Sequence, residues 1–317
     1  MNILDLPEDC IYEINKYLCY VDQMALKFSL CHNVKLDFIS ILNKKLSEHV
    51  KDVDKFIDEL IKNKAIISGS FILACLYDNN NYNDIDIYEY NKSDNYYYSN
   101  HYKPFDEMSK MQQYYYNQGY KWNSIKSIKS ESKFCGVIGR VRNFNYLDNN
   151  ISIQNILVNC NIMKFIDNSF DIEICKNIFN GTLMVKSWDN LFKRSSHIIP
   201  TWVLMVGNQY YCNDIKIFKK LIMYDDSCDI SITKYHDKNI LKNKLLKELE
   251  EKHIYRGNKY IERGYNIYKH KNYYEIYDIF IDNLISIFWE SNNDDYKGAY
   301  TIFINSSLYT KYLNLLT

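Results

Sequence analysis

The stretch Ala65-Ile66-Ile67-Ser68-Gly69-Ser70, with Asp84-Ile85-Asp86-Ile87 a short distance beyond it, decides the fold of this chain. The apolar run predicts a buried strand, Gly69-Ser70 predicts the turn that leaves it, and Phe71 to Tyr77 predicts the start of a helix. Side chains two apart on a strand share a face, so Asp84 and Asp86 project together while the isoleucines enter the core. Two such carboxylates can chelate magnesium, and free backbone N–H groups at the turn can hold phosphates.

Each half of this pattern also has an ordinary interpretation. Gly-Ser is a common turn, and Asp-x-Asp is common on the solvated edges of sheets. The combination of both halves, in the order strand, turn, helix and strand, is what favours a site that binds a metal ion and a nucleotide.

In this order the segment resembles the nucleotidyltransferase fold of the DNA polymerase beta type, over Ala65 to Tyr90 and more loosely over Lys133 to Lys186. The resemblance implies an α+β fold in which helices flank a mixed sheet. It also implies transfer of a nucleotide from a nucleoside triphosphate to an acceptor, assisted by two Mg2+ ions about 4 Å apart. It makes Gly69 and Ser70 nucleotide-binding residues, and the two aspartates catalytic metal ligands.

Two such ions usually need three carboxylates, and the resemblance places the third on the strand beside Asp-x-Asp. Counting strands, that is Ile151 to Leu157, which offers a serine and Gln154 instead of an acid. We therefore predict that Asp171, in the alternating run Phe170 to Cys175, is the third metal ligand and catalytic acid; the alternative is the solvent face of a sheet edge. The chain also resembles a looser group of proteins with these motifs in large DNA viruses and fungi, for which activity does not follow from the pattern.

A triphosphate carries more charge than two magnesium ions neutralise, so we expect positive side chains near it. We predict that Lys186 binds the nucleotide, with Arg140, Arg142 and Lys176 as further candidates. The densest basic run, 256–271, has interleaved tyrosines and could meet a nucleic acid. The ordinary interpretation of that run is a solvated helix face.

Composition bounds the remaining possibilities. Lys+Arg and Asp+Glu number 39 each, so no net charge recruits a nucleic acid or a membrane. The nine cysteines are scattered without a CxxC pair, which favours buried thiols in a reducing compartment over a zinc site or disulfides. No signal peptide is visible, and the most apolar stretch, 276–289, is too short to cross a bilayer. We expect a cytoplasmic protein with no membrane partner.

The N-terminal stretch from Ile3 to Leu18 predicts amphipathic helices, and Leu6-Pro7-Glu8-Asp9 predicts a helix start. This stretch resembles an F-box, the helical module that docks on the Skp adaptor of a ubiquitin ligase. The resemblance implies that residues 1–45 bind a Skp-type adaptor. The ordinary alternative is a helical cap, because an apolar helical surface must be covered either by a partner or by the neighbouring domain.

We expect three modules: an F-box-like helical module over 1–50, a nucleotidyltransferase-like α+β domain over 51–190 and a helical C-terminal lobe over 191–317. The middle module should hold a helix over 53–64, a hairpin of strands over 134–146 and 151–158, and a tyrosine-rich insertion over 91–132 with one helix. The best helix candidates of the lobe are 202–206, 215–222, 240–252 and 273–289.

These features support two hypotheses of different classes. The first is a Mg2+-dependent nucleotidyltransferase of viral origin in the host cytoplasm, which uses a nucleoside triphosphate and an unidentified acceptor. The alternative keeps the fold without the chemistry: an inactive adaptor that recruits targets to host ubiquitin ligase through the F-box-like module. A viral structural or packaging role is a third, less specific interpretation.

Overall fold

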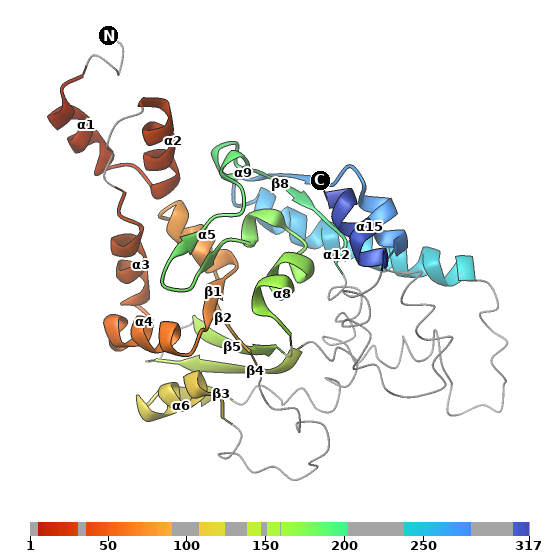
Figure 1. Cartoon of the computed structure of the whole chain (residues 1–317), viewed down its shortest axis with the longest axis horizontal. Coiled ribbons are helices and arrows are strands. Elements are labelled where there is room, and N and C mark those ends of the chain that lie inside the picture. The colour runs from red at the N-terminus through yellow and green to blue at the C-terminus, as the bar shows by residue number, and fades with distance from the viewer. Residues whose placement is uncertain are drawn as a thin grey trace.

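The computed structural model describes residues 6–30, 36–90, 108–123, 138–146, 151–158, 160–201, 238–279 and 307–316 of the chain (Figure 1). These residues form a mixed α+β fold in which helices flank a mixed sheet. The predicted fold class is confirmed at this level.

A seven-stranded sheet lies at the centre of the fold, with strands in the order β3-β4-β5-β2-β1-β6-β7. Within it β2 pairs parallel with β5, and the other pairs are antiparallel. The strands are β1 Ile66–Ser68, β2 Asp84–Tyr90, β3 Lys121–Asn123, β4 Ile138–Asn145, β5 Ser152–Val158, β6 Ile178–Phe179 and β7 Leu183–Met184. Helix α5 (Ser70–Leu76) lies between β1 and β2, so the predicted order of strand, turn, helix and strand is confirmed.

Helices cover both faces of this sheet. Asp84, Asp86 and Tyr88 of β2 share one face, where the Tyr88 ring lies 5.7 Å from Phe165 of α8 (Ile162–Ser169). On the opposite face Glu89 accepts a hydrogen bond of 3.3 Å from the Met111 N–H of α6 (Lys110–Asn117). Helix α6 and β3 belong to the predicted insertion, so this part of the insertion packs on the sheet.

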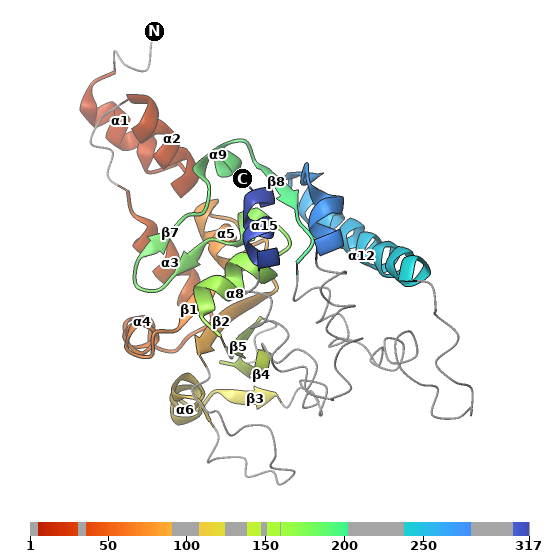
Figure 2. The ribbon, with the colours of Figure 1, turned by 45° about the vertical axis from the view of Figure 1, so that its right-hand side comes forward.

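Short helices precede the sheet region, as the sequence predicts. They are α1 (Glu8–Asn15), α2 (Tyr20–Leu30) and α3 (Phe38–Leu46). Both views place α1 and α2 at one corner of the molecule, away from α12 (Figures 1 and 2). The ring of Phe28 on α2 lies 5.9 Å from Phe192 of α9 (Trp188–Phe192), and Phe38 lies 6.1 Å from Phe179 of β6. Helices α2 and α3 thus pack on the α+β body. Helix α4 (Val53–Lys62) follows and confirms the predicted helix over 53–64.

The C-terminal part contains α12 (Lys238–Ile261), which is longer than the predicted helix 240–252. It runs through Gly257, where a Cβ would lie 3.2 Å from Ile198 Cδ1, so glycine lets α12 pack closely on β8 (Ser195–Ile198). β8 pairs parallel with β9 (Asn266–Lys269), and α15 (Ser307–Leu316) follows later. Residues 273–279 are helical as predicted, whereas the predicted helices 202–206 and 215–222 lie outside the described residues.

The strand predicted over Phe170 to Cys175 is wrong. Ile172 forms an isolated bridge with Ile198, and Glu173–Cys175 form a 3-10 turn. The Ile174 N–H donates to the hydroxyl of Ser196 at 3.1 Å, so it is satisfied without a neighbouring strand. An alternating pattern over six residues does not separate a strand from a bridge followed by a turn.

The described residues bear on two expectations from composition, one on membrane spans and one on cysteines. No helix within these ranges is long and apolar enough to cross a membrane. The five described cysteines are free thiols: Cys75 and Cys175 are buried as predicted, Cys19 and Cys160 are partly buried, and Cys10 is exposed.

Candidate functional site

The Gly69 turn and the Asp86 carboxylate lie against each other. Gly69 joins β1 to α5 with φ +85° and ψ −153°, a backbone conformation that is strained for any residue other than glycine. A Cβ on Gly69 would lie 3.0 Å from Asp86 Oδ2. The contact follows from the strand register, because Ser68 pairs with Asp86. The predicted turn and the predicted acid therefore meet in space.

Asp84 and Asp86, the acid pair, lie on one face of β2 and are partly buried. Burial raises the pKa of Asp86 well above its ordinary value of 3.8, and the charge of Asp84 raises it further. Burial also raises the pKa of Asp84. Ionising both carboxylates is unfavourable unless a cation is close. Their oxygens are the donors that Mg2+ prefers, so these residues fit a divalent cation.

Gln154 occupies the strand position where the resemblance places a third acid. In the parallel pairing of β2 with β5, Asp84 lies opposite Ser152 and Asp86 lies opposite Gln154. The Gln154 side chain donates a hydrogen bond of 3.1 Å from Nε2 to Asp84 Oδ2. An amide adds no negative charge, so strands β2 and β5 supply two carboxylates here instead of three.

Asp171, predicted as the third metal ligand, lies in another cluster. Its side chain is buried, with Oδ1 3.0 Å from Arg256 Nη2 and Oδ2 3.9 Å from His253 Nε2. Within the described ranges, the His, Cys, Asp and Glu side chains form no group of three that could hold a metal ion. The structure therefore pairs Asp171 with an arginine and does not bring it together with the acid pair.

The positive charges of three basic residues, here called the basic stripe, favour the ionised form of the acid pair. Arg256 and Lys259 lie on α12, and Arg263 lies in the turn that follows it. Against the larger effect of burial, Lys259 and Arg263 lower the pKa of Asp84. Arg256 and Lys259 do the same for the pKa of Asp86. The sequence shows a basic run here but carries no signal that this run meets the acids.

Contacts through Cys175 place α12 beside the Gly69 turn. The Gly69 N–H donates to the Cys175 carbonyl at 3.2 Å, and the Cys175 thiol donates to the Tyr260 hydroxyl of α12 at 2.9 Å. Just after α12, the Tyr265 ring lies 5.5 Å from Tyr77 at the end of α5. The helix that carries the stripe is therefore fixed to the turn that meets Asp86.

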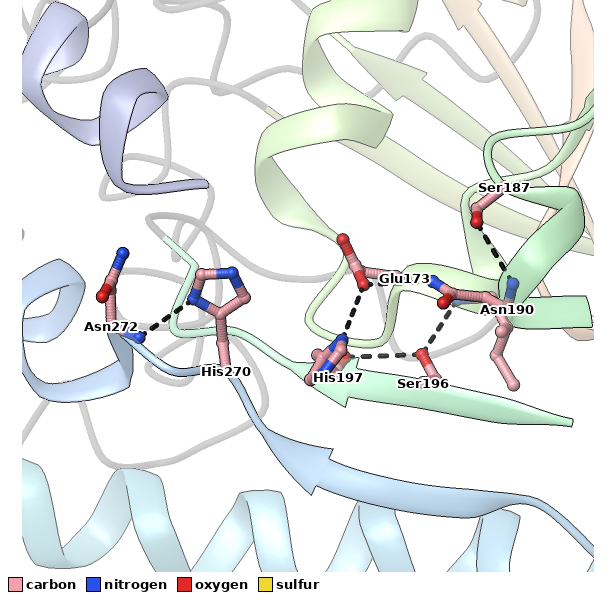
Figure 3. Close-up of polar contacts among 8 residues, drawn as sticks. Glu173, Ser187, Asn190, Ser196, His197, His270 and Asn272 are labelled. Carbon is pink, nitrogen blue, oxygen red and sulfur yellow. Dashed lines mark hydrogen bonds and ion pairs between the residues drawn. The ribbon is translucent and has the colours of Figure 1, made fainter. Parts of the chain in front are cut away.

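A polar cluster holds the turn Glu173–Cys175 (Figure 3). Glu173 Oε2 accepts a hydrogen bond of 3.4 Å from Asn190 Nδ2 and lies 3.3 Å from His197 Nδ1, which ties α9 and β8 to the turn. The His270 ring lies 5.8 Å from the His197 ring. Because this turn supplies the Cys175 carbonyl that accepts from the Gly69 N–H, the cluster helps to hold the Gly69 turn in place.

The side chains predicted to hold phosphates have other neighbours. Buried Arg142 donates to Gln112 Oε1 at 2.7 Å. Lys176 Nζ donates to the backbone carbonyl of Asp167 at 2.7 Å, and Lys186 Nζ lies 2.7 Å from the Asp167 carboxylate. The side chain of Arg140 lies outside the described residues. A nucleotide-binding role for Lys186 stays a prediction, as does that of partly buried Ser70.

Comparison of the chain with protein families, with curated proteins and with solved structures finds no significant match. The case for function therefore rests on the residues and their geometry.

Proposed function

We propose that this chain binds a nucleoside triphosphate together with Mg2+ at the acid pair, in the manner of a nucleotidyltransferase. The observation that carries the proposal is the 3.0 Å approach between the Cβ position of Gly69 and Asp86 Oδ2. A glycine turn without a side chain leaves room for a ligand close to the backbone, and two carboxylates beside it provide metal ligands. The basic stripe adds positive charge on the same side.

In nucleotidyl transfer, an acceptor oxygen attacks the α-phosphorus, the bond to the bridging oxygen breaks, and pyrophosphate leaves. Bound to Asp84 and Asp86, Mg2+ would supply charge neutralisation for the phosphate oxygens. The chain's own residues position the reactants: Gly69 allows close approach of the nucleotide, and the basic stripe faces its negative charge. We propose transfer to an unidentified acceptor as the activity.

Calorimetric titration of ATP in the presence of MgCl2 tests the binding step. The wild type should bind ATP, and Asp84→Ala plus Asp86→Ala should weaken this binding at least about tenfold, because both proposed ligands are lost. The matched control is Asp54→Ala plus Asp58→Ala, which removes two exposed acids from α4. Equal ATP affinity of the wild type and the acid-pair variant would remove the proposal. Release of pyrophosphate from NTP then tests transfer.

A second candidate function is an inactive adaptor, which the amide of Gln154 in the third-acid position favours. The N-terminal part also exposes large side chains: Tyr12 of α1 is 52% exposed, Tyr17 in the turn after α1 is 87% exposed, and Phe28 of α2 is 58% exposed. Under this alternative, α1 and α2 bind a Skp-type adaptor, and the α+β body binds a target without catalysing a reaction.

Co-purification with a Skp-type adaptor tests this alternative. Deleting residues 1–45 would also remove the core side chains of Phe38 and Leu42, so surface variants are cleaner. Tyr12→Ala plus Tyr17→Ala should abolish co-purification, whereas Tyr90→Ala plus Tyr255→Ala, which changes exposed tyrosines elsewhere, should not. Failure of the wild type to bind excess adaptor would contradict the adaptor function.

A further inference from the structure

We propose that the outer face of helix α12 is an interface between two copies of this chain, which pack against each other with their α12 helices antiparallel. The outer face is defined by exposed residues of α12 and of the turn that follows it: Lys247, Glu251, Ile254, Tyr255, Asn258, Ile261 and Glu262. An assembly of this kind does not depend on the proposed function, because the outer face contains neither the acid pair nor the basic stripe.

The residues of the outer face form one continuous seam along the helix. Positions 247, 251, 254, 258 and 261 recur at intervals of four and three residues, the spacing with which helices pack in a coiled coil. Glu262 lies just after α12, but its N–H still donates to the Asn258 carbonyl at 2.9 Å, so it continues the helical path. The seam therefore extends over about four helical turns, roughly 22 Å.

Another face of α12 holds the helix on the rest of the chain. His253 Nδ1 lies 2.6 Å from the Tyr273 hydroxyl, and the Tyr260 hydroxyl accepts from the Cys175 thiol at 2.9 Å. Because residues three and four apart share a face of a helix, the outer face is turned away from these contacts. Figure 2 shows the N-terminal part of α12 extending away from the sheet, on the side opposite to α1 and α2.

Apolar side chains lie at the centre and near the end of the outer face. Ile254 is 58% exposed, Tyr255 is 76% exposed and Ile261 is 52% exposed. Three large side chains gathered on one exposed helix face favour a partner that covers them. A contact of about four helical turns per copy is small, so the dimer should be weak, with a Kd in the micromolar range.

The charges of the outer face identify the partner as a second copy. When two antiparallel copies meet about a two-fold axis between residues 254 and 255, residues at equal distances on either side of the axis face each other. Lys247 of one copy then faces Glu262 of the second copy, and the symmetry repeats this pair at the other end of the seam. An ion pair therefore forms at each end of the interface.

The inner positions are complementary in the same register. Glu251 faces Asn258 of the second copy, whose amide can donate a hydrogen bond to the carboxylate. Ile254 faces Tyr255 of the second copy, which places apolar side chains at the axis. A parallel pairing would instead place Lys247 against Lys247 and Glu251 against Glu251, and these like charges repel. The outer face is therefore complementary to itself when the helices are antiparallel, and not when they are parallel.

Sedimentation velocity of the full chain over a range of micromolar concentrations tests the interface. The wild type should show a concentration-dependent equilibrium between monomer and dimer. Lys247→Glu and Glu262→Lys, each alone, should weaken dimerisation at least about tenfold, because each replaces both ion pairs by contacts between like charges. The matched controls are Lys55→Glu and Asp58→Lys on exposed positions of α4, which should leave the equilibrium unchanged.

Mixing the two interface variants tests the antiparallel arrangement. Lys247→Glu and Glu262→Lys carry opposite charges at the positions that face each other, so an equimolar mixture should form a heterodimer with nearly the affinity of the wild type. The double variant, with both substitutions in one chain, restores the ion pairs with reversed sign and should also dimerise. Circular dichroism and thermal unfolding check that each variant is folded.

Four results would overturn the proposal. A wild type that stays monomeric throughout is the result expected if another segment of the same chain covers the outer face. A dimer that neither variant weakens would mean that the copies associate through another surface. Equal weakening in the α4 controls would mean that net charge, and not the outer face, controls association. Failure of both the mixture and the double variant to restore dimerisation would exclude the antiparallel pairing of Lys247 with Glu262.

Discussion

Gly69, at the end of β1, lies next to Asp86 of the neighbouring strand β2, with 3.0 Å between Asp86 Oδ2 and the position that a Cβ of Gly69 would occupy. The pairing of Ser68 with Asp86 sets this proximity, and Gly69, with a φ of +85°, leads the chain from β1 into α5. The relationship makes one site of two motifs that are separated in the sequence.

Substituting Gly69 should affect both stability and metal binding. Gly69→Ala introduces backbone strain and a contact with Asp86, so the free energy of unfolding should fall by about 2–3 kcal/mol. Gly119→Ala is the matched control, because Gly119 also has a positive φ, +80°, but nothing lies within 4 Å of its Cβ position. That variant should cost about 1 kcal/mol. Urea unfolding measures both, and only Gly69→Ala should lower the affinity for Mn2+ in a titration followed by electron paramagnetic resonance.

Gln154, an amide where a third carboxylate is expected, should limit the negative charge of the site and therefore its affinity for a metal ion. Gln154→Glu removes the hydrogen bond to Asp84 and adds a third carboxylate, so the metal-free protein should lose about 1–2 kcal/mol of stability. Its Mn2+ affinity should rise roughly tenfold, because the ligand charge increases. Gln113→Glu, an exposed position on α6, makes the same charge change as a control. Unchanged Mn2+ affinity in Gln154→Glu would show that residue 154 does not reach the site.

The acid pair should give the metal-free protein a defined pH dependence. The folded-state pKa of Asp86 is raised above 3.8 by burial and by Asp84, although Arg256 and Lys259 oppose this. The folded state therefore binds the proton more tightly than the unfolded state, and this stability is present below about pH 4 and lost as pH rises through the folded pKa.

Asp86→Asn removes that dependence. The difference in unfolding free energy, variant minus wild type, should therefore increase from pH 4 toward pH 8 in EDTA, as measured by urea unfolding at each pH. Saturating Mg2+ should reduce this difference. Parallel curves for the two proteins would contradict a raised pKa of Asp86 in the folded state.

In the tyrosine-rich insertion, Tyr115 of α6 should contribute to the core and its neighbour Tyr116 should not. Tyr115 is fully buried, and its ring lies 4.7 Å from Phe144 of β4, whereas neighbouring Tyr116 is 51% exposed. Tyr115→Ala should cost about 3–5 kcal/mol and Tyr116→Ala within about 0.5 kcal/mol. Thermal and urea unfolding distinguish the two. Equal effects would mean that α6 does not pack on the sheet.

The sequence predicts the local parts of this fold well. The strand at 66–68, the helix after Gly69 and the strand at 84–90 follow from apolar runs and period-two alternation, and the structure confirms them. The β-branched run between turn residues predicts the strand that holds Gln154, and the resemblance, with a count of strands, places it correctly beside Asp86. The predictions of the individual strands and the helix depend only on neighbours within a few residues.

The remainder of the site depends on tertiary packing, which a short pattern does not contain. Asp171 looks like a cleft acid by alternation, but its segment is a bridge and a turn, and its carboxylate pairs with Arg256 from α12. The approach of α12 depends on Gly257 meeting Ile198, a contact between residues far apart in the chain. The basic run in the sequence therefore predicts a positive charge, but it does not predict which acids that charge faces.

The most direct test of the central claim is an anomalous difference map from crystals of the chain grown with MnCl2. The account predicts a manganese ion bound by carboxylate oxygens of both Asp84 and Asp86, next to the Gly69 turn. Manganese bound only elsewhere, with both carboxylates held by the basic stripe instead, would contradict it.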